Sequence, residues 1–412
     1  MATIIPFRAI KPTKDKVHMV VSRSVAVYSR RILNAKLETN PFSFLHVIKP
    51  EHFSSKKSKP ASLELFKKVR GKFEEYCNEG ILIQDKTPSF YIYRQIKPEG
   101  SYTGIIGGVS IDDYLDGNIK VHEQTLTKRE KIFEKYLSVC DFNAEPVLLT
   151  YPDQQEVNSV VEKTTETIPY FDFSTTDRIR HQLWPIGDLP TIEKLQQSFT
   201  KINSIYIADG HHRSASSALL GKHKREQNPN FTGDEGYNSI LAYLIPESQL
   251  AIHDFNRLVK DLNGNSLEQL LNKIADHFII EPQDHLFKPT QLHEFSMYLD
   301  KKWYKLKLKP REVDETDPVA TLDSAILTEF ILDPIFDIKD LKTSSRISFL
   351  GGLNGMEGLQ NEVDKNKAEI AFGLFPVSIE QLKLIADTHN IMPPKTTWIE
   401  PKLRSGLTIF EL

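Results

Sequence analysis

The sequence has little cysteine, no long apolar run and no excess of basic charge. Its two cysteines, Cys77 and Cys140, are too few for a disulfide framework or a cysteine zinc site and fit a reducing compartment, although the two could still pair. The longest apolar run, 240–245, has the length of a strand, so no membrane span is expected. Basic residues interrupt the first sixteen positions, and no signal peptide is predicted. These absences favour a cytoplasmic protein.

The charge balance argues against a further class of protein, the general nucleic-acid binders. The chain has 52 Lys and Arg against 55 Asp and Glu, a formal net charge of −3, whereas a general nucleic-acid binder carries a clear basic excess. No repeat of 20–50 residues is visible, which excludes solenoids and propellers. The 412 residues, with 23 Phe, 14 Tyr and 3 Trp, are ample for a large core and allow two to three domains at about 150 residues each. The oligomeric state stays open.

Helical and strand periodicities alternate along the chain, which predicts a mixed α/β (α+β) fold whose strand order is not readable. The pattern changes after Asp254, so we expect a body at 1–255 and a C-terminal α+β region at 256–412. The predicted helices are 63–77, 125–140, 191–201, 213–221, 267–277, 320–332 and 379–389. The predicted strands are 89–95, 105–111, 146–150, 204–208, 237–245, 295–299, 303–308 and 368–375, and the predicted loops are 54–60, 222–235 and 310–318.

The sharpest local feature is the segment 205–218, in which a buried strand ends at Asp209-Gly210 and a helix rich in small residues follows. Gly210 permits a tight turn and lets the backbone approach a ligand closely. The free N–H groups of the first helical turn and the positive end of the helix dipole form an anion site. Arg213 adds a planar donor fork and Ser214 a hydroxyl. The pattern is consistent with a cradle for phosphate or a nucleotide.

Other readings of the same segment stay open. Asp-Gly is also an ordinary turn in which Asp209 caps the helix, and His211 and His212 are equally consistent with solvated loop residues or with proton carriers near neutral pH. The two adjacent histidines cannot easily face one metal ion. Mg²⁺ accompanying a nucleotide needs only one or two carboxylates, and Asp209 is the candidate ligand or base.

Three weaker polar clusters accompany this motif. His122-Glu123 precedes a predicted helix. Either Thr125 simply caps this helix, or His122 and Glu123 contribute to a site. His181 and Trp184 could wall a pocket, although a core position explains the tryptophan equally well. The irregular segment 392–407 holds three cations that could close over an anionic ligand or pack across the domain, namely Lys395, Lys402 and Arg404.

Several motifs in one order resemble a bacterial family called domain of unknown function 1015, and the resemblance runs from about residue 5 to the end. The matching positions are 6–8, 40–41, 88–91, 122–123, 181 with 184, 209–213, 256–257 and 392–407. This family is similar to the ParB/sulfiredoxin-like nucleotide-binding fold, in which a strand, a glycine turn and a helix N-terminus hold phosphates. A relative with the same Asp-Gly-His-His-Arg element is a free serine kinase, which phosphorylates L-serine with ADP or ATP.

The resemblance therefore implies a small-molecule kinase that uses ATP or ADP with Mg²⁺, in which Gly210, His211, His212 and Arg213 contact phosphates. One departure affects the catalytic part of this expectation. Many family members carry Pro-Tyr-Asp-Val near the N-terminus, and Ala26 stands here where that Asp would be. A methyl group accepts no proton, so the base is Asp209 or Glu123, or the chain is a regulatory module that binds nucleotide without catalysis. A ParB-like DNA-binding role is disfavoured by the net charge and by the lack of a basic helix.

Overall fold

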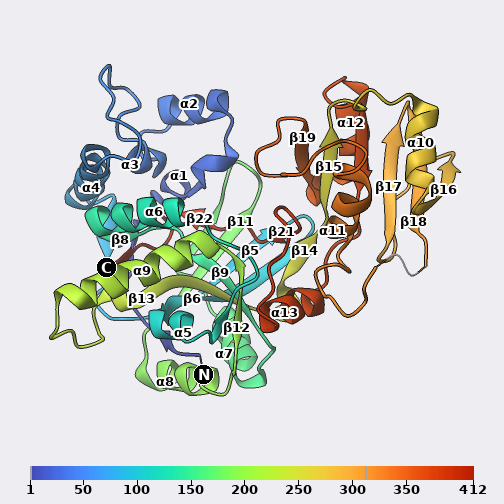
Figure 1. Cartoon of the computed structure of the whole chain (residues 1–412). Coiled ribbons are helices and arrows are strands. Elements are labelled where there is room, and N and C mark those ends of the chain that lie inside the picture. The colour runs from blue at the N-terminus through green and yellow to red at the C-terminus, as the bar shows by residue number, and fades with distance from the viewer. Residues whose placement is uncertain (1, 311–312) are drawn as a thin grey trace. The chain divides into compact units, whose positions relative to one another are not determined.

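The computed structural model describes residues 2–310 and 313–412, which fold into two compact units (Figure 1). Unit 1 comprises Met1–Val121, Thr125–Leu250 and Pro401–Leu412. Unit 2 comprises His122–Gln124 and Ala251–Glu400. The C-terminal segment thus belongs to the same unit as the Asp-Gly-His-His-Arg motif. Residues 311 and 312 of the predicted 310–318 loop lie outside the described residues.

The core of unit 1 is a mixed sheet with the strand order β10-β11-β5-β6-β13-β9-β12-β7, and β1 adds to β6. Neighbouring strands are antiparallel except at β13–β9 and β12–β7, which are parallel. The strands of this sheet are β1 (Ile4–Ile5), β5 (Phe90–Lys97), β6 (Gly100–Ser110), β7 (Ile119–Lys120), β9 (Val147–Tyr151), β10 (Phe171–Ser174), β11 (Arg180–Ile186), β12 (Ile205–Asp209) and β13 (Ser239–Pro246). Strands β9 and β13 are buried along their whole length, which explains their continuous apolar sequences.

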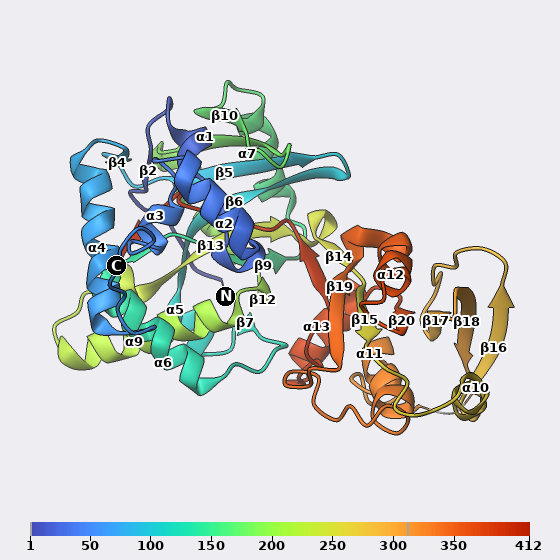
Figure 2. The same cartoon turned by 90° about the horizontal axis from the view of Figure 1, so that it is seen from above.

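Helices and short ribbons complete unit 1. The helices are α1 (Val17–Val20), α2 (Arg30–Thr39), α3 (Leu45–Ile48), α4 (Leu63–Asn78), α5 (Ile111–Leu115), α6 (Thr127–Cys140), α7 (Gln155–Thr165), α8 (Leu189–Phe199) and α9 (His211–Gln227). Three two-stranded ribbons pair β2 (Ile10–Pro12) with β4 (Leu82–Gln84), β3 (Ser22–Arg23) with β22 (Arg404–Ser405), and β8 (Phe142–Asn143) with β23 (Phe410–Glu411). Through β23 the C-terminal end pairs with β8, and Gln84 Nε2 of β4 donates to Glu411 Oε2 at 3.3 Å, so this end lies on the side of unit 1 that carries α4 and β4 (Figure 2).

Two apolar clusters hold unit 1 together. One joins the sheet to α7 and α8 through residues such as Leu149, Val157 and Leu195. The other lies between α3, α4 and α6 and includes Phe73 and Phe142, whose ring centroids are 4.2 Å apart. Cys77 and Cys140 are both free cysteines, so they do not pair.

The helix after the motif is longer than the sequence predicts. We expected it to end near Gly221 and the charged run after it to be a loop, but α9 continues to Gln227. Gly221 does not end the helix because a Cβ there would lie 2.3 Å from Ile111 Cδ1, so the glycine permits close packing instead. Lys224 and Arg225 in the last turn complement the negative end of the helix dipole.

Unit 2 is built on an antiparallel six-stranded sheet with the order β16-β18-β17-β20-β15-β19. Its strands are β15 (Phe255–Val259), β16 (Phe278–Gln283), β17 (Glu294–Leu299), β18 (Lys302–Leu308), β19 (Ile347–Gly351) and β20 (Ile370–Gly373), and a ribbon pairs β14 (Ala251–His253) with β21 (Trp398–Glu400). The helices are α10 (Leu267–Ala275), α11 (Asp323–Leu327), which continues as a π-helical turn over Thr328–Leu332, α12 (Gly355–Asp364) and α13 (Ile379–Asp387). The predicted β17–β18 hairpin is confirmed, with Asp300 and Lys301 both at positive φ. The mixed α/β prediction is likewise confirmed.

Candidate functional site

The Asp-Gly-His-His-Arg motif forms the junction between β12 and α9. Gly210 is the N-cap residue of α9 and has φ +109° and ψ +27°, a conformation that L side chains rarely adopt. A Cβ at this position would lie 3.0 Å from Val147 Cγ1 and 3.1 Å from Arg213 Nη2. Glycine is therefore required both by the backbone conformation and by the close approach of these two side chains. Gly210 has no side chain that could cap the helix, so the first N–H groups of α9 donate no hydrogen bond to a side chain of the N-cap residue.

Arg213 is anchored beside this turn. Its Nη1 donates to the carbonyl oxygens of Glu145 at 3.1 Å and Pro146 at 2.6 Å, and it lies 3.1 Å from Glu145 Oε1. The other oxygen of this carboxylate accepts a 2.9 Å hydrogen bond from Ser405 Oγ. The guanidinium is thus a fixed positive charge at the N-terminal end of α9.

The other motif residues differ in exposure. His211 and Ser214 are buried, and the Ser214 hydroxyl donates back to the carbonyl of Gly210 at 3.3 Å, while His212 is half-buried. Asp209 is the exposed carboxylate of the motif, with 42% of its side chain accessible, and its Oδ2 lies 2.9 Å from Lys402 Nζ. The turn therefore presents one carboxylate, paired with an ammonium group, next to a fixed guanidinium.

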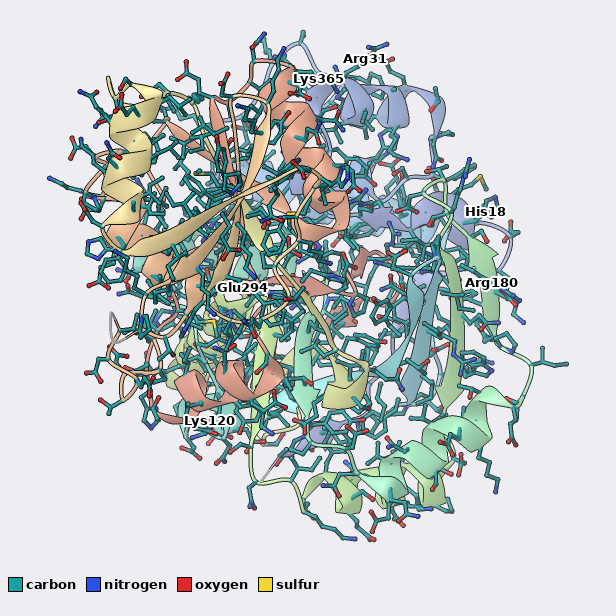
Figure 3. All side chains as sticks on the ribbon, turned by 90° about the vertical axis from the view of Figure 1, so that its right-hand side faces the viewer. His18, Arg31, Lys120, Arg180, Glu294 and Lys365 are labelled. Carbon is teal, nitrogen blue, oxygen red and sulfur yellow. The ribbon has the colours of Figure 1, made fainter. Side chains whose placement is uncertain are left out.

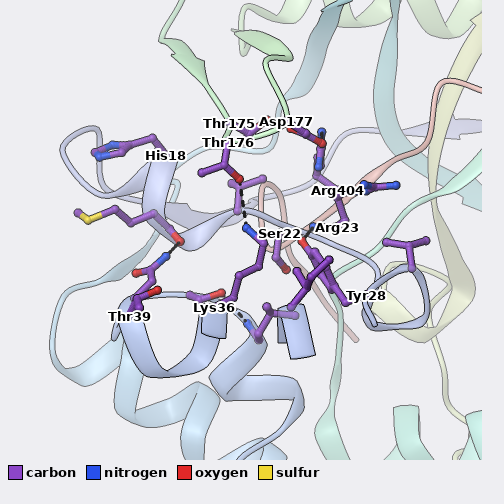
Figure 4. A pocket seen from close by; sticks show the side chains of 17 residues that line it. His18, Ser22, Arg23, Tyr28, Lys36, Thr39, Thr175, Thr176, Asp177 and Arg404 are labelled. Carbon is purple, nitrogen blue, oxygen red and sulfur yellow. Dashed lines mark hydrogen bonds and ion pairs between the residues drawn. The ribbon is translucent and has the colours of Figure 1, made fainter. Parts of the chain in front are cut away.

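The C-terminal segment that supplies Lys402 also reaches a pocket. Gln95 Nε2 donates to the carbonyl of Lys402 at 3.2 Å, and two residues later Arg404 Nη2 donates to Asp177 Oδ2 at 2.7 Å. Arg404 is one of the 17 residues that line a pocket of about 280 Å³ (Figure 4). The rest of the lining comes from 18–45 and from Thr175, Thr176 and Asp177. Two residues of extended chain span about 7 Å. The segment from Lys402 to Arg404 therefore contacts the motif at one end and the pocket at the other.

A chain of hydrogen bonds beneath the pocket fixes the tautomer of His181. Asp177 as a carboxylate can only accept, so Thr175 Oγ1 donates to it, and the Thr175 oxygen in turn accepts from His181 Nε2 at 3.0 Å. His181 Nδ1 then accepts from the Tyr93 hydroxyl at 2.8 Å. Burial is the main cause that lowers the pKa of His181 to about 3, and the charge of Arg404 adds to it. His181 is therefore a neutral support behind the pocket wall.

Asp177 remains ionised at this position. Burial acts to raise its pKa, but the hydrogen bond from Thr175 and the positive charge of Arg404 outweigh burial, and the pKa lies below its usual value. Asp177 therefore supplies a fixed negative charge to the pocket wall.

The remaining predicted residues belong to the core of unit 1 or to unit 2. Trp184 belongs to the apolar core of unit 1 and donates from Nε1 to the Thr167 carbonyl at 2.9 Å. His122, Glu123 and Lys395 belong to unit 2, where the His122 carbonyl accepts from Met392 N and Lys395 Nζ lies 5.5 Å from the Phe255 ring centroid.

The prediction that Thr125 is the N-cap of the helix after His122-Glu123 is wrong. Thr125 does not cap α6, which has Leu126 at its N-cap, and the Thr125 hydroxyl donates instead to the Glu130 carboxylate.

Sequence reasoning missed Glu145, Asp177, Arg23 and Lys36. Each is an ordinary charged residue in a loop, short strand or surface helix, and its place depends on pairing with distant segments such as 401–405. The Asn-Ala-Glu-Pro stretch before β9 gives no local signal that its glutamate anchors Arg213.

Two features are absent from the described residues, a cluster of metal ligands and a membrane-spanning helix. Within 2–310 and 313–412 no three His, Cys, Asp or Glu side chains are grouped so as to hold a metal ion. None of the helices in these ranges is both long and apolar enough to cross a bilayer.

Fold and site together define a mixed α/β protein with a glycine turn at a helix N-terminus and a pocket lined by arginines. The chain belongs to the family described as Protein of unknown function (DUF1015), whose model matches residues 4–325, as the sequence resemblance indicated. No protein with a curated description matches the sequence.

Solved structures similar to the chain share little sequence with it. C-terminally truncated SbnI from Staphylococcus aureus has 12% identity and a TM-score of 0.39, over 74% of this chain and 87% of its own. A free serine kinase in complex with AMP has 11% identity and a TM-score of 0.36, over 74% and 91%. A conserved hypothetical protein from Pyrococcus furiosus has 12% identity and a TM-score of 0.34, over 73% and 95%.

Proposed function

We propose that the chain binds a nucleotide by its phosphates at the β12–α9 turn and transfers a phosphoryl group to a small hydroxy compound. The observation that supports this most is the anchored guanidinium of Arg213 against the backbone of Gly210. Arg213 makes hydrogen bonds in the described residues through Nη1 alone, so Nε and Nη2 are left to a ligand. A fixed cation at a helix N-terminus suits a phosphate group.

The reaction would be ordinary phosphoryl transfer. The bond between the terminal phosphorus and its bridging oxygen breaks, a bond forms from that phosphorus to the acceptor oxygen, and the hydroxyl proton passes to a carboxylate. Asp209 is the accessible carboxylate of the motif and is the proposed proton acceptor. His212, in the first turn of α9, is the proposed second polar group at the transferred phosphate. Positioning and electrostatics would supply most of the rate.

Asp209 is also the residue that would hold Mg²⁺. One carboxylate suffices for an ion that is carried in by nucleotide phosphates, and the ion would neutralise their charge. Lys402 competes for the same carboxylate at 2.9 Å, so a loaded site requires this ion pair to open. Nucleotide binding should therefore be measured with and without Mg²⁺.

A binding module without turnover is the second candidate. Ala26 lies exposed in the short 3₁₀ turn Val25–Val27, where many family members carry an acid, and this turn adjoins the pocket. If the acid at that position is the base in those relatives, this chain would bind nucleotide and leave it intact.

The two candidates separate in one set of measurements on the full chain. Calorimetry with ADP and ATP, with and without Mg²⁺, measures binding, and ³¹P NMR with L-serine and a panel of other hydroxy compounds measures transfer. We expect Arg213→Gln to weaken nucleotide binding about tenfold or more, since a hydrogen bond to a charged group contributes about 1.5–3 kcal/mol. Lys222→Gln, an exposed change of equal charge later in α9, should leave binding unchanged. Binding without any phosphorylated product would favour the module, and no binding of either nucleotide would refute both.

A further inference from the structure

The pocket at Arg404 holds more positive than negative charge. Three cationic side chains line it, Arg23, Lys36 and Arg404, against the single carboxylate of Asp177 (Figure 4). Asp177 pairs with Arg404 at 2.7 Å, and Lys36 Nζ donates to the Thr176 hydroxyl at 3.1 Å. Within the described ranges no carboxylate pairs with Arg23 or Lys36. The pocket therefore has a local excess of positive charge in a protein whose net charge is −3.

The backbone places two of these cations opposite each other. Strands β3 and β22 pair antiparallel, with Arg23 directly across from Arg404 and Ser22 across from Ser405. Like charges on directly opposed residues of a ribbon repel each other. The carboxylate of Asp177 forms an ion pair with Arg404 and is the one negative charge among the described residues that line the pocket. A second anion between the guanidinium groups would relieve the repulsion.

Two buried donors in the pocket wall also lack acceptors. Arg404 is 4% exposed and Ser22 is 5% exposed. Arg404 Nε and Ser22 Oγ make no hydrogen bond to any other atom in the described part of the chain. A buried donor without an acceptor costs free energy comparable to a lost hydrogen bond, so such atoms point to a partner that the protein itself does not supply.

We propose that this pocket binds a small molecule through an oxyanion, a carboxylate or a phosphate, with Arg404 and Arg23 as its counter-charges. The planar donor fork of arginine matches both groups, and Ser22 and Lys36 add further donors to the lining. The apolar part of the ligand would contact the apolar residues of the lining, Val21, Val27, Ile32 and Leu45. At about 280 Å³ the pocket falls just below the range of about 300–1,000 Å³ for drug-sized ligands, so the occupant is a small metabolite.

The test uses three probes that share a carbon skeleton and the full chain without nucleotide. Calorimetry at low salt compares glycerol, glycerate and glycerol 3-phosphate. We expect at least one of the two anions to bind and glycerol not to bind, and the preferred anion identifies the group that the pocket takes. Because no nucleotide is present, failure of the proposed phosphotransferase activity would leave this test intact.

The variants assign the binding to the pocket. Arg23→Gln should weaken binding of the preferred anion about tenfold or more, and Lys36→Met, a second variant on half-exposed α2, should weaken it several-fold. The matched control is Arg31→Gln, which removes the same charge from an exposed position of α2 outside the pocket (Figure 3). The proposal is overturned if neither anion binds, if glycerol binds as tightly as the anions, or if Arg31→Gln weakens binding as much as Arg23→Gln.

Discussion

The pKa of His181 makes a quantitative prediction about stability. Its imidazole is fully buried between the rings of Tyr93 and Phe173, at centroid distances of 6.0 and 5.1 Å, and both ring nitrogens are engaged. Burial lowers its pKa from 6.5 to about 3. In the unfolded chain the same group takes up a proton near pH 6.5, so below this pH the unfolded state binds a proton that the folded state excludes.

The sign and size follow from this difference. A lowered histidine pKa means that stability is fully present above the unfolded pKa and is lost as the pH falls from about 6.5 towards 3. The loss is about 1.4 kcal/mol for each pH unit, or about 2 kcal/mol between neutral pH and pH 5. The variant His181→Gln cannot titrate, so its stability should lack this term, although it has a constant cost from altered packing.

Urea unfolding of both proteins at pH 7.5, 6 and 5 measures the difference. The transition of unit 1 should lose about 2 kcal/mol more in the wild type than in His181→Gln over this range, because all other groups titrate alike in the two proteins. In the native protein the Cε1 proton signal of His181 should not shift between pH 8 and 5. Equal pH slopes for the two proteins, or an imidazole that titrates near pH 6.5, would refute the assignment of a neutral buried His181.

Other residues give further predictions. Gly210→Ala places a Cβ 3.0 Å from Val147 in a backbone at φ +109° and should destabilise the chain by about 1 kcal/mol or more in thermal unfolding, whereas Gly233→Ala, at φ +97° in open space, should show only the cost of the conformation. Burial raises the pKa of Asp323 to about 7, so the stability that this group contributes falls as the pH rises from about 4 through 7, and Asp323→Asn should be the more stable protein at pH 8 by urea unfolding. Glu145→Gln removes the carboxylate that holds Arg213, a half-exposed ion pair worth at most about 1 kcal/mol, so calorimetry should show a drop in nucleotide affinity of up to about fivefold.

The parts of the site that sequence predicts are those with a local cause. The junction at Gly210 follows from a buried strand, a residue that tolerates positive φ and a run of small residues, all within fourteen positions. Lys402 and Arg404 were expected either to close over an anionic ligand or to pack across the domain. Their carboxylate partners, Asp209 and Asp177, could not be predicted, because they lie far away in the sequence and no periodicity connects them. The end of α9 was misplaced because the packing of Gly221 against Ile111 is likewise a tertiary effect.

The ion pair between Lys402 and Asp209 allows a last prediction that separates binding from chemistry. Removing the ammonium in Lys402→Met leaves the Asp209 carboxylate uncompensated beside the proposed phosphate site. Two unit charges 4 Å apart interact by about 1 kcal/mol in water and about 4 kcal/mol nearer a protein surface, and the 42% exposure of Asp209 favours the lower figure. When binding is measured without Mg²⁺, which would otherwise occupy the freed carboxylate, nucleotide affinity should therefore fall about fivefold.

The double variant Lys402→Met with Asp209→Asn should recover the affinity measured without Mg²⁺, because the repelling charge is gone. It should nevertheless transfer no phosphoryl group when Mg²⁺ is added, because the proton acceptor is gone as well. A simple structural role for Lys402 predicts instead that the double variant binds no better than Lys402→Met. Calorimetry on the four proteins of this cycle measures the coupling directly. Recovery of binding together with loss of transfer is the result that places Asp209 at the phosphates as a chemical group, and retained transfer in Asp209→Asn would move the base to another residue.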